Sequence, residues 1–374
     1  WRTILTDGGA ALILIGALVL YAFFYPIPYQ RSVLKDVPVA VVDLDASAAS
    51  RQLVRMIEAH ELLRVATSVG SLADAERAVY EGRAAGVFVV PAGFERAIRR
   101  GEQARVAVHA DASYFLVYRQ VLTGAAEVTA TLSAGIEVRR LQAQGLSSDA
   151  AMKARDPMPL GSRPLFNPTE GYAAYVVPAV LVLILQQTLL VGIGLVRGTA
   201  RDRHAGAKGP AGSHPPVLAT VVGRILAYVT LYLFHALFYF GIVLHLLGFP
   251  QRADAAVLFA FILPFLLAVT SLGLAVSAVF RTREMSIQVL LCTSLPAIFL
   301  AGFAWPIESL PAWLRALSLA LPSTSAIPGF LRLSQMGATL ADVRVEWLLM
   351  WKLAAAYFAA AWTSEWRERR VRRA

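Results

Sequence analysis

Long uncharged runs separated by short polar stretches dominate this chain, apart from one extended polar segment near its start. The first run, from about Ala10 to Pro28, ends among Tyr21, Tyr25 and Tyr29. Tyrosines are enriched where a membrane span meets the bilayer interface, and a cleaved signal peptide would have a shorter apolar core with a small-residue cleavage site. We therefore expect residues 1–29 to form a retained first transmembrane helix.

Five further apolar runs follow the polar segment. About 20 helical residues cover the roughly 30 Å of bilayer hydrocarbon, so each run is long enough to be interpreted as a span. Residues 304–344 are different, because four prolines divide them into apolar pieces too short to cross. We predict a re-entrant or interfacial hairpin there, on the outer side. The predicted further spans are 172–196, 217–249, 255–280, 287–303 and 347–362, within a bundle covering residues 164–366.

The polar segment, residues 30–163, alternates short β-type runs with helical patterns. This order predicts helices packed on a mainly parallel or mixed sheet. A helical pattern at 114–144 then follows, long enough to form a stalk. The expected strands are 39–42, 63–69, 85–90 and 106–109, and the expected helices are 47–59, 71–82 and 94–100.

Composition and charge agree with a polytopic membrane protein. Hydrophobic residues make up 57% of the chain and charged residues only 16%, against about 25% charged in ordinary soluble domains. The net charge of +10 is better explained by basic cytoplasmic loops than by nucleic-acid binding. Counting arginines and lysines across six crossings places both termini, the loop 197–216 and the basic tail 367–374 in the cytoplasm, with the α/β domain outside.

Several kinds of chemistry are excluded by the sequence. Cys292 is the only cysteine, so an intrachain disulfide and a thiolate metal cluster are ruled out. The chain has no phosphate-binding loop of the Gly-x-x-x-x-Gly-Lys-Ser/Thr type, so it does not split ATP by that mechanism and we expect it to bind no cofactor itself. Asp43 and Asp45 follow a predicted strand and suit either a metal or ribose site or, more simply, helix capping. For His109 and Asp111 the same two interpretations, a binding site or a local structural role, remain open.

Three short motifs carry a resemblance to a known family. They are Val-Pro-Val-Ala-Val-Val-Asp-Leu-Asp at 37–45, Leu-Phe-Asn-Pro at 165–168 with Tyr-Val-Val-Pro at 175–178, and Leu-Ala-Gly-Phe-Ala-Trp-Pro-Ile-Glu at 300–308. In this order and spacing they resemble the ABC-2 type permeases, in the branch with a large extracytoplasmic domain between the first two of six spans.

The resemblance implies a function and a set of partners. Such a permease would be the non-catalytic subunit of an ATP-driven exporter in a bacterial inner membrane, moving a hydrophobic or amphipathic substrate. It would pair with a second permease and with cytoplasmic ATP-binding subunits that hold ATP and Mg²⁺. A periplasmic adaptor and an outer-membrane channel join some related systems. The alternative from a different class is a membrane-anchored sensor or scaffold whose α/β domain binds a ligand without transport.

One departure from the family pattern concerns the loop after the second span. Family members often carry a charged run ending in Gly-Thr that forms a helix docking on the ATPase. Here Arg197-Gly198-Thr199 is followed by several glycines, which disfavour a helix. We therefore expect a short or displaced docking helix.

Two groups of residues are candidates for function. Polar residues inside predicted spans either line a substrate path or hydrogen-bond between helices. These are Gln186, Gln187, His235 and Tyr239. Charged and polar residues at the predicted cytoplasmic turns either contact an ATPase or are plain topology-setting charge. These are Arg197, Thr199, Arg201, Arg203, Arg281, Arg283 and Glu284.

Overall fold

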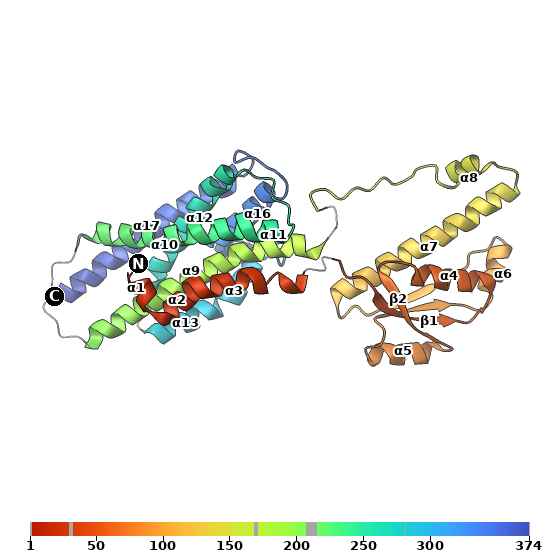
Figure 1. The fold of residues 1–374 in the computed structure, drawn as a ribbon, viewed down its shortest axis with the longest axis horizontal. Helices are drawn as coiled ribbons and strands as arrows, with labels where there is room; N and C mark the ends of the chain where they lie inside the picture. Colours follow the sequence, from red (N-terminus) through yellow and green to blue (C-terminus); the bar gives the residue numbers. More distant parts are fainter. Residues whose placement is uncertain (1, 30–32, 168–170, 207–214, 281, 374) are drawn as a thin grey trace. The chain divides into compact units, whose positions relative to one another are not determined.

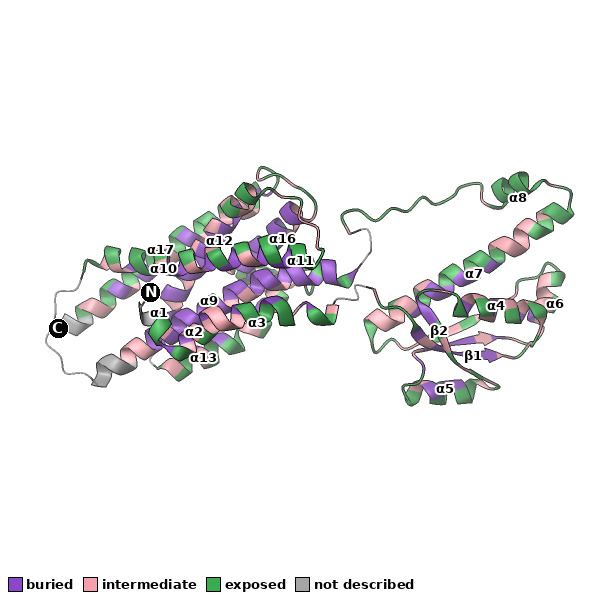
Figure 2. Cartoon of the chain, in the orientation of Figure 1, coloured by how far each residue is buried: buried purple, intermediate pink, exposed green. Residues whose placement is uncertain are grey.

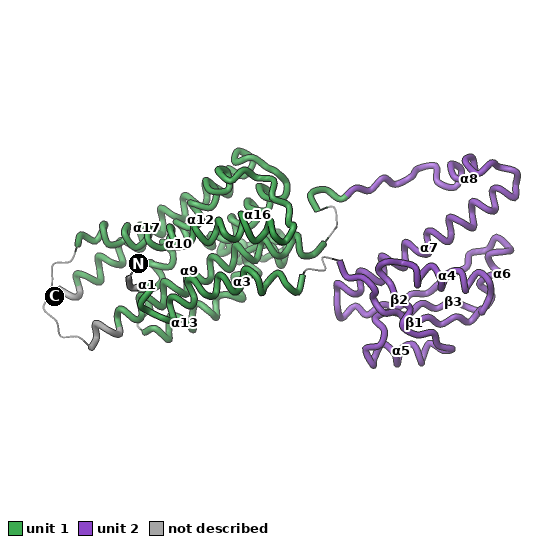
Figure 3. The backbone as a smooth tube through the Cα atoms, viewed as in Figure 1, with its two compact units in different colours: residues 1–32, 164–374 green, residues 33–163 purple. Residues whose placement is uncertain are grey.

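A computed structural model describes residues 2–29, 33–167, 171–206, 215–280 and 282–373. The chain divides into two compact units, drawn in different colours in Figure 3. One unit comprises residues 33–163, close to the predicted domain 30–163, and the other comprises residues 1–32 with 164–374. We refer to them as the α/β unit and the helical unit.

The α/β unit is built on a four-stranded sheet of order β2-β1-β3-β4. β1 pairs in parallel with both β2 and β3, whereas β4 is antiparallel to β3, so the predicted mixed sheet is confirmed. The strands are β1 (Val37–Asp43), β2 (Leu63–Val69), β3 (Gly86–Val90) and β4 (Ala107–Ala110). The helices are α4 (Ala48–Glu58), α5 (Leu72–Tyr80), α6 (Phe94–Arg99), α7 (Phe115–Ala143) and α8 (Ser148–Arg155), as Figure 1 shows.

Alternating side chains of β1 supply two separate apolar cores. Val39 and Val41 belong to a large core shared with α4, α6 and α7. Ala40 and Val42 belong to a smaller core beneath α5, in which alanines predominate. Because successive strand residues point to opposite faces, a single buried strand can hold helices on both sides of the sheet.

The two aspartates after β1 stabilise local backbone structure. Asp43 accepts hydrogen bonds from the N–H groups of Asp45 and Ala46, at 3.0 and 2.9 Å. Asp45 caps the start of α6, where it accepts from the N–H groups of Gly93 and Glu95, at 2.7 and 2.9 Å. The Ser47 hydroxyl, followed by these backbone groups, lowers the pKa of Asp45. The geometry therefore favours helix capping for Asp45, whereas Asp43 stabilises the turn between β1 and α4.

Among its described residues, the helical unit contains five helical segments long and apolar enough to cross a membrane. They are Gly8–Tyr29, Tyr172–Arg201, Val217–Leu246, Ala255–Ser277 and Arg283–Leu300. The second is the central one, since 78% of its apolar stretch is buried, against 17 to 56% for the others. Figure 2 shows this buried segment running through the unit.

The spans are assembled from several helical pieces. The first follows the short helix α1 (Arg2–Thr6) and comprises α2 (Gly8–Ala11), the π-helix η1 (Leu12–Gly16), α3 (Ala17–Phe24) and η2 (Ile27–Tyr29). The next two are α9 (Tyr172–Gly206) and the series α10 (Val217–Leu237), π-helix η3 (Phe238–Val243) and α11 (Leu244–Leu246). The rest of the unit comprises α12 (Ala255–Ser277), α13 (Arg283–Cys292), α14 (Ser294–Leu300), η4 (Ile307–Ser309), α15 (Ala312–Ser318), α16 (Pro322–Ser334) and α17 (Arg344–Arg373).

The predicted hairpin at 304–344 contains the short helices α15 and α16. α16 lies alongside half of α9, because Gln335 bonds the carbonyl of Ala174 and Ser323 bonds Gln186. Gln186 is near the middle of the α9 span, about 20 Å of helix from Tyr172. α16 therefore reaches deep into the unit, as a re-entrant element would.

Two sequence-based expectations need correction, and a third is not confirmed. The predicted loop 197–216 begins too early, because α9 continues as helix to Gly206; tertiary contacts of Arg197 and Arg201, described below, outweigh the low helix propensity of glycine. The predicted fifth span is divided at Thr293 into α13 and α14. The predicted sixth span, 347–362, lies within the helix α17, which is not among the five apolar segments found in the described residues, so a sixth crossing stays a prediction.

Candidate functional site

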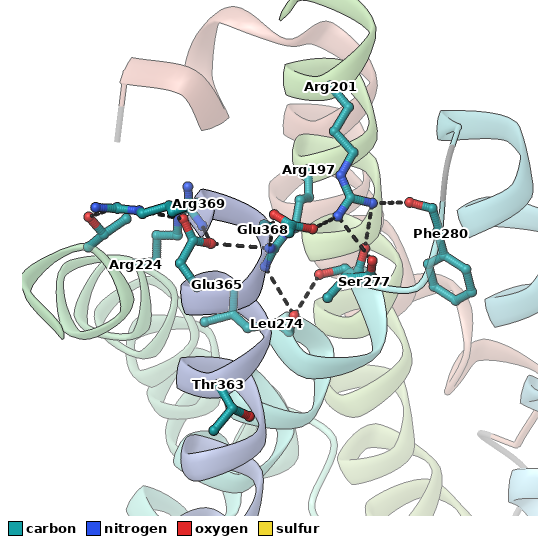
Figure 4. A network of polar contacts seen from close by, with 12 residues as sticks. Arg197, Arg201, Arg224, Leu274, Ser277, Phe280, Thr363, Glu365, Glu368 and Arg369 are labelled. Atoms are coloured by element: carbon teal, nitrogen blue, oxygen red, sulfur yellow. Dashed lines mark hydrogen bonds and ion pairs between the residues drawn. The ribbon is translucent and has the colours of Figure 1, made fainter. Parts of the chain in front are cut away.

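Two arginines one helical turn apart bind the last part of α9 to its neighbours. Arg197 and Arg201 lie four residues apart, so their side chains leave the same face of the helix. Arg197 is only 9% exposed. Figure 4 shows both guanidinium groups pointing toward the ends of α12 and α17.

The C-terminal end of α12 provides carbonyl acceptors for both arginines. Arg197 donates to the carbonyl of Leu274 at 3.1 Å. Arg201 donates to the carbonyls of Ser277 and Ala278 at 3.1 Å each, and also to that of Phe280. The last carbonyls of a helix have no intrahelical partner and carry partial negative charge, so arginines are well suited to this position.

Two glutamates of α17 neutralise the arginines. Glu365 accepts from Arg197 at 3.1 Å and from Arg224 of α10 at 2.8 Å, and Arg369 approaches it at 3.5 Å. Glu368 accepts from Arg197 at 2.8 Å and also from Arg201. We call this set the charged junction: Arg197, Arg201, Arg224, Glu365, Glu368 and Arg369, with the carbonyl groups at the end of α12.

Because the charged junction is buried, its arginines and glutamates depend on one another as partners. Glu365 is 7% exposed, so its carboxylate and the Arg197 guanidinium have lost most of their hydration. Removing water from charges costs several kcal/mol per ion, and only close partners offset that cost. The side chains are therefore held in one arrangement, and this arrangement fixes the ends of α9, α10, α12 and α17 to one another.

A second group of contacts joins α9 to α13 and to the first span. Gly198 permits the closest approach, because a Cβ atom there would lie 2.6 Å from the Cα of Arg283. Arg283 donates to the Thr199 hydroxyl at 3.3 Å and lies 3.6 Å from the carboxylate of Asp7. Asp7 also caps α2 by accepting from the N–H groups of Gly9 and Ala10, at 3.1 Å each.

Asp7 is 5% exposed and remains suited to carrying a negative charge. Burial acts to raise the pKa of Asp7, but the hydrogen bond with Thr199, the two backbone N–H groups and the Arg283 guanidinium together lower it below its ordinary value. The end of α9 is thus connected by polar contacts to the first span, α10, α12, α13 and α17.

Only some of the residues predicted to contact an ATPase lie together at the end of α9. Arg197, Thr199, Arg201 and Arg283 are brought together around the end of α9, where their polar groups bond to neighbouring helices. Glu284 is exposed in the first turn of α13 and has no polar partner in the described part of the chain. The side chain of Arg203 and all of Arg281 lie outside the described residues.

The predicted substrate-path residues lie between helices. Gln186 is fully buried and makes two bonds with Ser323, at 3.0 and 2.9 Å. Tyr239 is fully buried and donates to the carbonyl of Leu18 at 2.6 Å. His235 is 5% exposed and contacts the backbone of Leu14, while its Nε2 is buried with no partner among the described residues. Gln187 is half-buried, and its Oε1 likewise has no partner there.

These contacts favour the hydrogen-bonding interpretation for Gln186 and Tyr239. A buried amide or hydroxyl that already has good partners fixes helix packing and has little capacity left for a passing molecule. The searched residues contain no group of three or more His, Cys, Asp or Glu side chains arranged to hold a metal ion.

The sequence interpretation did not identify the acidic members of the site. Glu365 precedes and Glu368 lies within the basic tail 367–374, which the sequence analysis uses only as a topology signal. Their spacing of three residues places both on one face of a helix, and that pattern was the available signal. Asp7 gave a weaker signal, since a lone aspartate before a span usually caps it.

The sequence comparison is consistent with this architecture of apolar helices and an inserted α/β unit. The family model for ABC-2 family transporter proteins matches residues 10–363, nearly the whole chain. The chain belongs to the ABC-2 transporter family. It is therefore a multi-pass membrane protein of the permease type, and the family match includes the whole α/β unit.

Relatives of this ABC-2 protein include permeases named for drug and antibiotic transport. The probable multidrug ABC transporter permease YbhS of Escherichia coli K12 is 26% identical over 166 residues, which cover 42% of each chain. The linearmycin resistance permease protein LnrN of Bacillus subtilis is 22% identical over 342 residues, covering 87% of this chain and 86% of LnrN. The aligned segment thus spans less than half of YbhS but most of LnrN.

Removing the negative charge of Glu365 should destabilise the helical unit. In Glu365→Gln, the arginines at 197, 224 and 369 lose a shared carboxylate, and Arg197 remains buried with weaker compensation. We expect a loss of about 3 kcal/mol of stability, the typical cost of breaking a buried ion pair from one side. Thermal denaturation of the purified chain in detergent should show a clear fall in the midpoint.

Glu284→Gln is the matched control, because it removes the same charge from an exposed side chain on α13. Its midpoint should stay close to that of the wild type. Equal midpoints for Glu365→Gln and the wild type would show that the junction contributes little to holding the helices together.

Proposed function

We propose that this chain is the permease subunit of an ATP-driven exporter that moves a hydrophobic or amphipathic substrate out of the cytoplasm or the inner leaflet. Membership of the ABC-2 family supports a permease role. The names of the E. coli and B. subtilis relatives support drug-like or antibiotic-like substrates. ATP and Mg²⁺ would be held by a separate ATP-binding subunit.

The observation that carries the proposal is the convergence of contacts on the end of α9. Polar contacts there reach α10, α12 and α17 through the charged junction, and reach α13 and the first span through Arg283 and Asp7. A displacement applied to this end by a partner would be transmitted to all of these helices together. Interlocked buried charges suit that role, because they favour discrete arrangements over gradual deformation.

The coupling contact would be made by exposed groups beside the junction. Arg197 is too buried to touch a partner directly, so we assign it a positioning role. Glu284, exposed in the first turn of α13 and next to Arg283, is the better candidate for direct contact with the ATP-binding subunit.

The proposed topology has six crossings, with α17 as the sixth and the charged junction on the cytoplasmic side. Its basis is the concentration of arginines at the junction end, together with the positive-inside rule. The α/β unit would then lie outside the cytoplasm. A second permease, a periplasmic adaptor and an outer-membrane channel would complete the assembly.

Labelling of single cysteines tests this topology. In a Cys292→Ser background, a membrane-impermeant maleimide should label Ser148→Cys of the α/β unit in spheroplasts with intact inner membranes. Arg367→Cys of α17 should be labelled only after permeabilisation. Both positions are exposed, so access is decided by the membrane. The opposite pattern would invert the orientation, and labelling of both in intact spheroplasts would exclude a sixth crossing by α17.

Reversing one exposed charge tests the coupling contact. Glu284→Arg should lower copurification of the ATP-binding subunit about tenfold, as expected when a close opposite-charge contact becomes a repulsive one. The control is Glu308→Arg, an exposed glutamate in η4 beyond the far end of α14. Recovery unchanged by Glu284→Arg would remove this residue from the proposed contact.

The export activity itself is tested in inverted membrane vesicles. The chain is produced together with a candidate ATP-binding subunit, and uptake of Hoechst 33342 and of an NBD-labelled phospholipid is followed. We expect ATP-dependent uptake of at least one probe and faster ATP hydrolysis when the permease is present. If no ATP-binding protein copurifies and ATP hydrolysis is the same without the chain, the proposal is wrong and a ligand-binding sensor becomes the better interpretation.

A further inference from the structure

The far half of α7 forms one wall of a cleft that the permease role does not explain. Leu132 is the last buried residue of α7, and from Ser133 to Ala143 the helix has no buried side chain. α8 packs against α7 through the fully buried Ala151. Between the two helices lies a cleft of about 670 Å³, a volume within the range of small-molecule sites.

Basic side chains dominate the charge of this cleft. Arg139 of α7 and Arg155 and Lys153 of α8 line it, with Asp156 as the single carboxylate. Lys153 is paired with Asp149 at 2.9 Å. The guanidinium groups of Arg139 and Arg155 make no hydrogen bond or ion pair with any described residue. Two guanidinium groups on facing walls repel each other, and an anion between them would remove that repulsion.

The remaining surface of the cleft is apolar. Ala134 and Val138 lie on the α7 wall, and Met152 and Pro159 lie on the other. Met152 is 59% exposed, although it is a side chain that usually becomes buried against other apolar groups. Methionine adapts its shape to flexible apolar ligands such as alkyl chains. The cleft therefore combines a cationic part with an uncovered apolar part.

We infer that the α7–α8 cleft binds an amphipathic anion, a molecule with an alkyl body and a carboxylate or phosphate headgroup. The guanidinium groups of Arg139 and Arg155 match the two oxygens of such a headgroup, since a planar fork of N–H donors binds these anions in a bidentate manner. The alkyl body lies against Val138 and Met152. This inference rests on the proposed export of amphipathic substrates, to which it adds a headgroup class and a holding site on the α/β unit.

Photocrosslinking tests the cleft on the full chain. The protein is placed in nanodiscs of phosphatidylcholine and exposed to palmitate carrying a diazirine in its alkyl chain, and the adducts are mapped by peptide mass spectrometry. We expect adducts within residues 134–159, and displacement by lysophosphatidate. The corresponding diazirine-bearing alcohol, which has the same chain and no charge, should leave this segment largely unlabelled.

Two variants separate the headgroup from the apolar surface. Arg139→Gln with Arg155→Gln should lower cleft labelling about tenfold or more, from the loss of charge-assisted hydrogen bonds. Gly135→Trp should block labelling without changing charge, because a Cβ at Gly135 meets nothing within 4 Å and the ring can occupy the cleft. Arg64→Gln, at an exposed arginine of β2, is the matched control and should label like the wild type.

Several results would overturn the inference. They are adducts confined to the helical unit, equal labelling by acid and alcohol, or full labelling of the double glutamine variant. Inorganic phosphate competing as well as lysophosphatidate would reduce the cleft to a general anion-binding surface and would also contradict it. Neither ATP nor a partner subunit is present, so a negative result bears on the cleft and leaves the export proposal to the vesicle experiment.

Discussion

The buried pairing of Arg197 with Glu365 and Glu368 is the interaction on which the helical unit depends most. Each of these groups alone would be costly to remove from water, and together they neutralise one another. Because the partners come from different helices, this requirement fixes α9, α12 and α17 in register at one end. The same arginines also donate to carbonyl groups in the last turn of α12, which lack the full set of partners found inside a helix.

At the centre of the bundle the helices are held by neutral polar contacts. Gln186 bonds Ser323 of α16, and Tyr239 bonds the backbone of the first span. In a membrane, helices gain little from apolar burial against one another, so close packing and hydrogen bonds contribute a large share of their association. The bundle is thus held by charged contacts at one end and by neutral hydrogen bonds near its middle.

The α/β unit is organised differently, by apolar burial on both faces of a small sheet. That arrangement accounts for α4, α5 and α6 and for the first half of α7. It does not account for the last part of α7 beyond Ile136, which carries Arg139 and Arg140 and has no buried side chain. The proposed binding of an amphipathic anion between α7 and α8 gives these side chains a role outside the core.

The sequence by itself determined the elements that depend on local pattern. Short β-type runs were sufficient to predict the strands of the α/β unit, including β2 at 63–69. The length of the apolar runs was sufficient to predict the first four spans. The motifs at 37–45, 165–178 and 300–308 were sufficient for the family. These features can be predicted from the sequence because strand and helix periodicity and bilayer thickness constrain residues that are neighbours along the chain.

The tertiary structure decided what depends on distant partners. The helix through Gly198 to Gly206 was missed because glycine propensity argues against it, and only the contacts of Arg197 and Arg201 with α12 and α17 explain it. Glu365 and Glu368 lie beside and within the predicted basic tail, and their shared partner Arg197 is 168 and 171 residues away along the chain. Buried ion pairs are specified by three-dimensional proximity, which neither composition nor periodicity records.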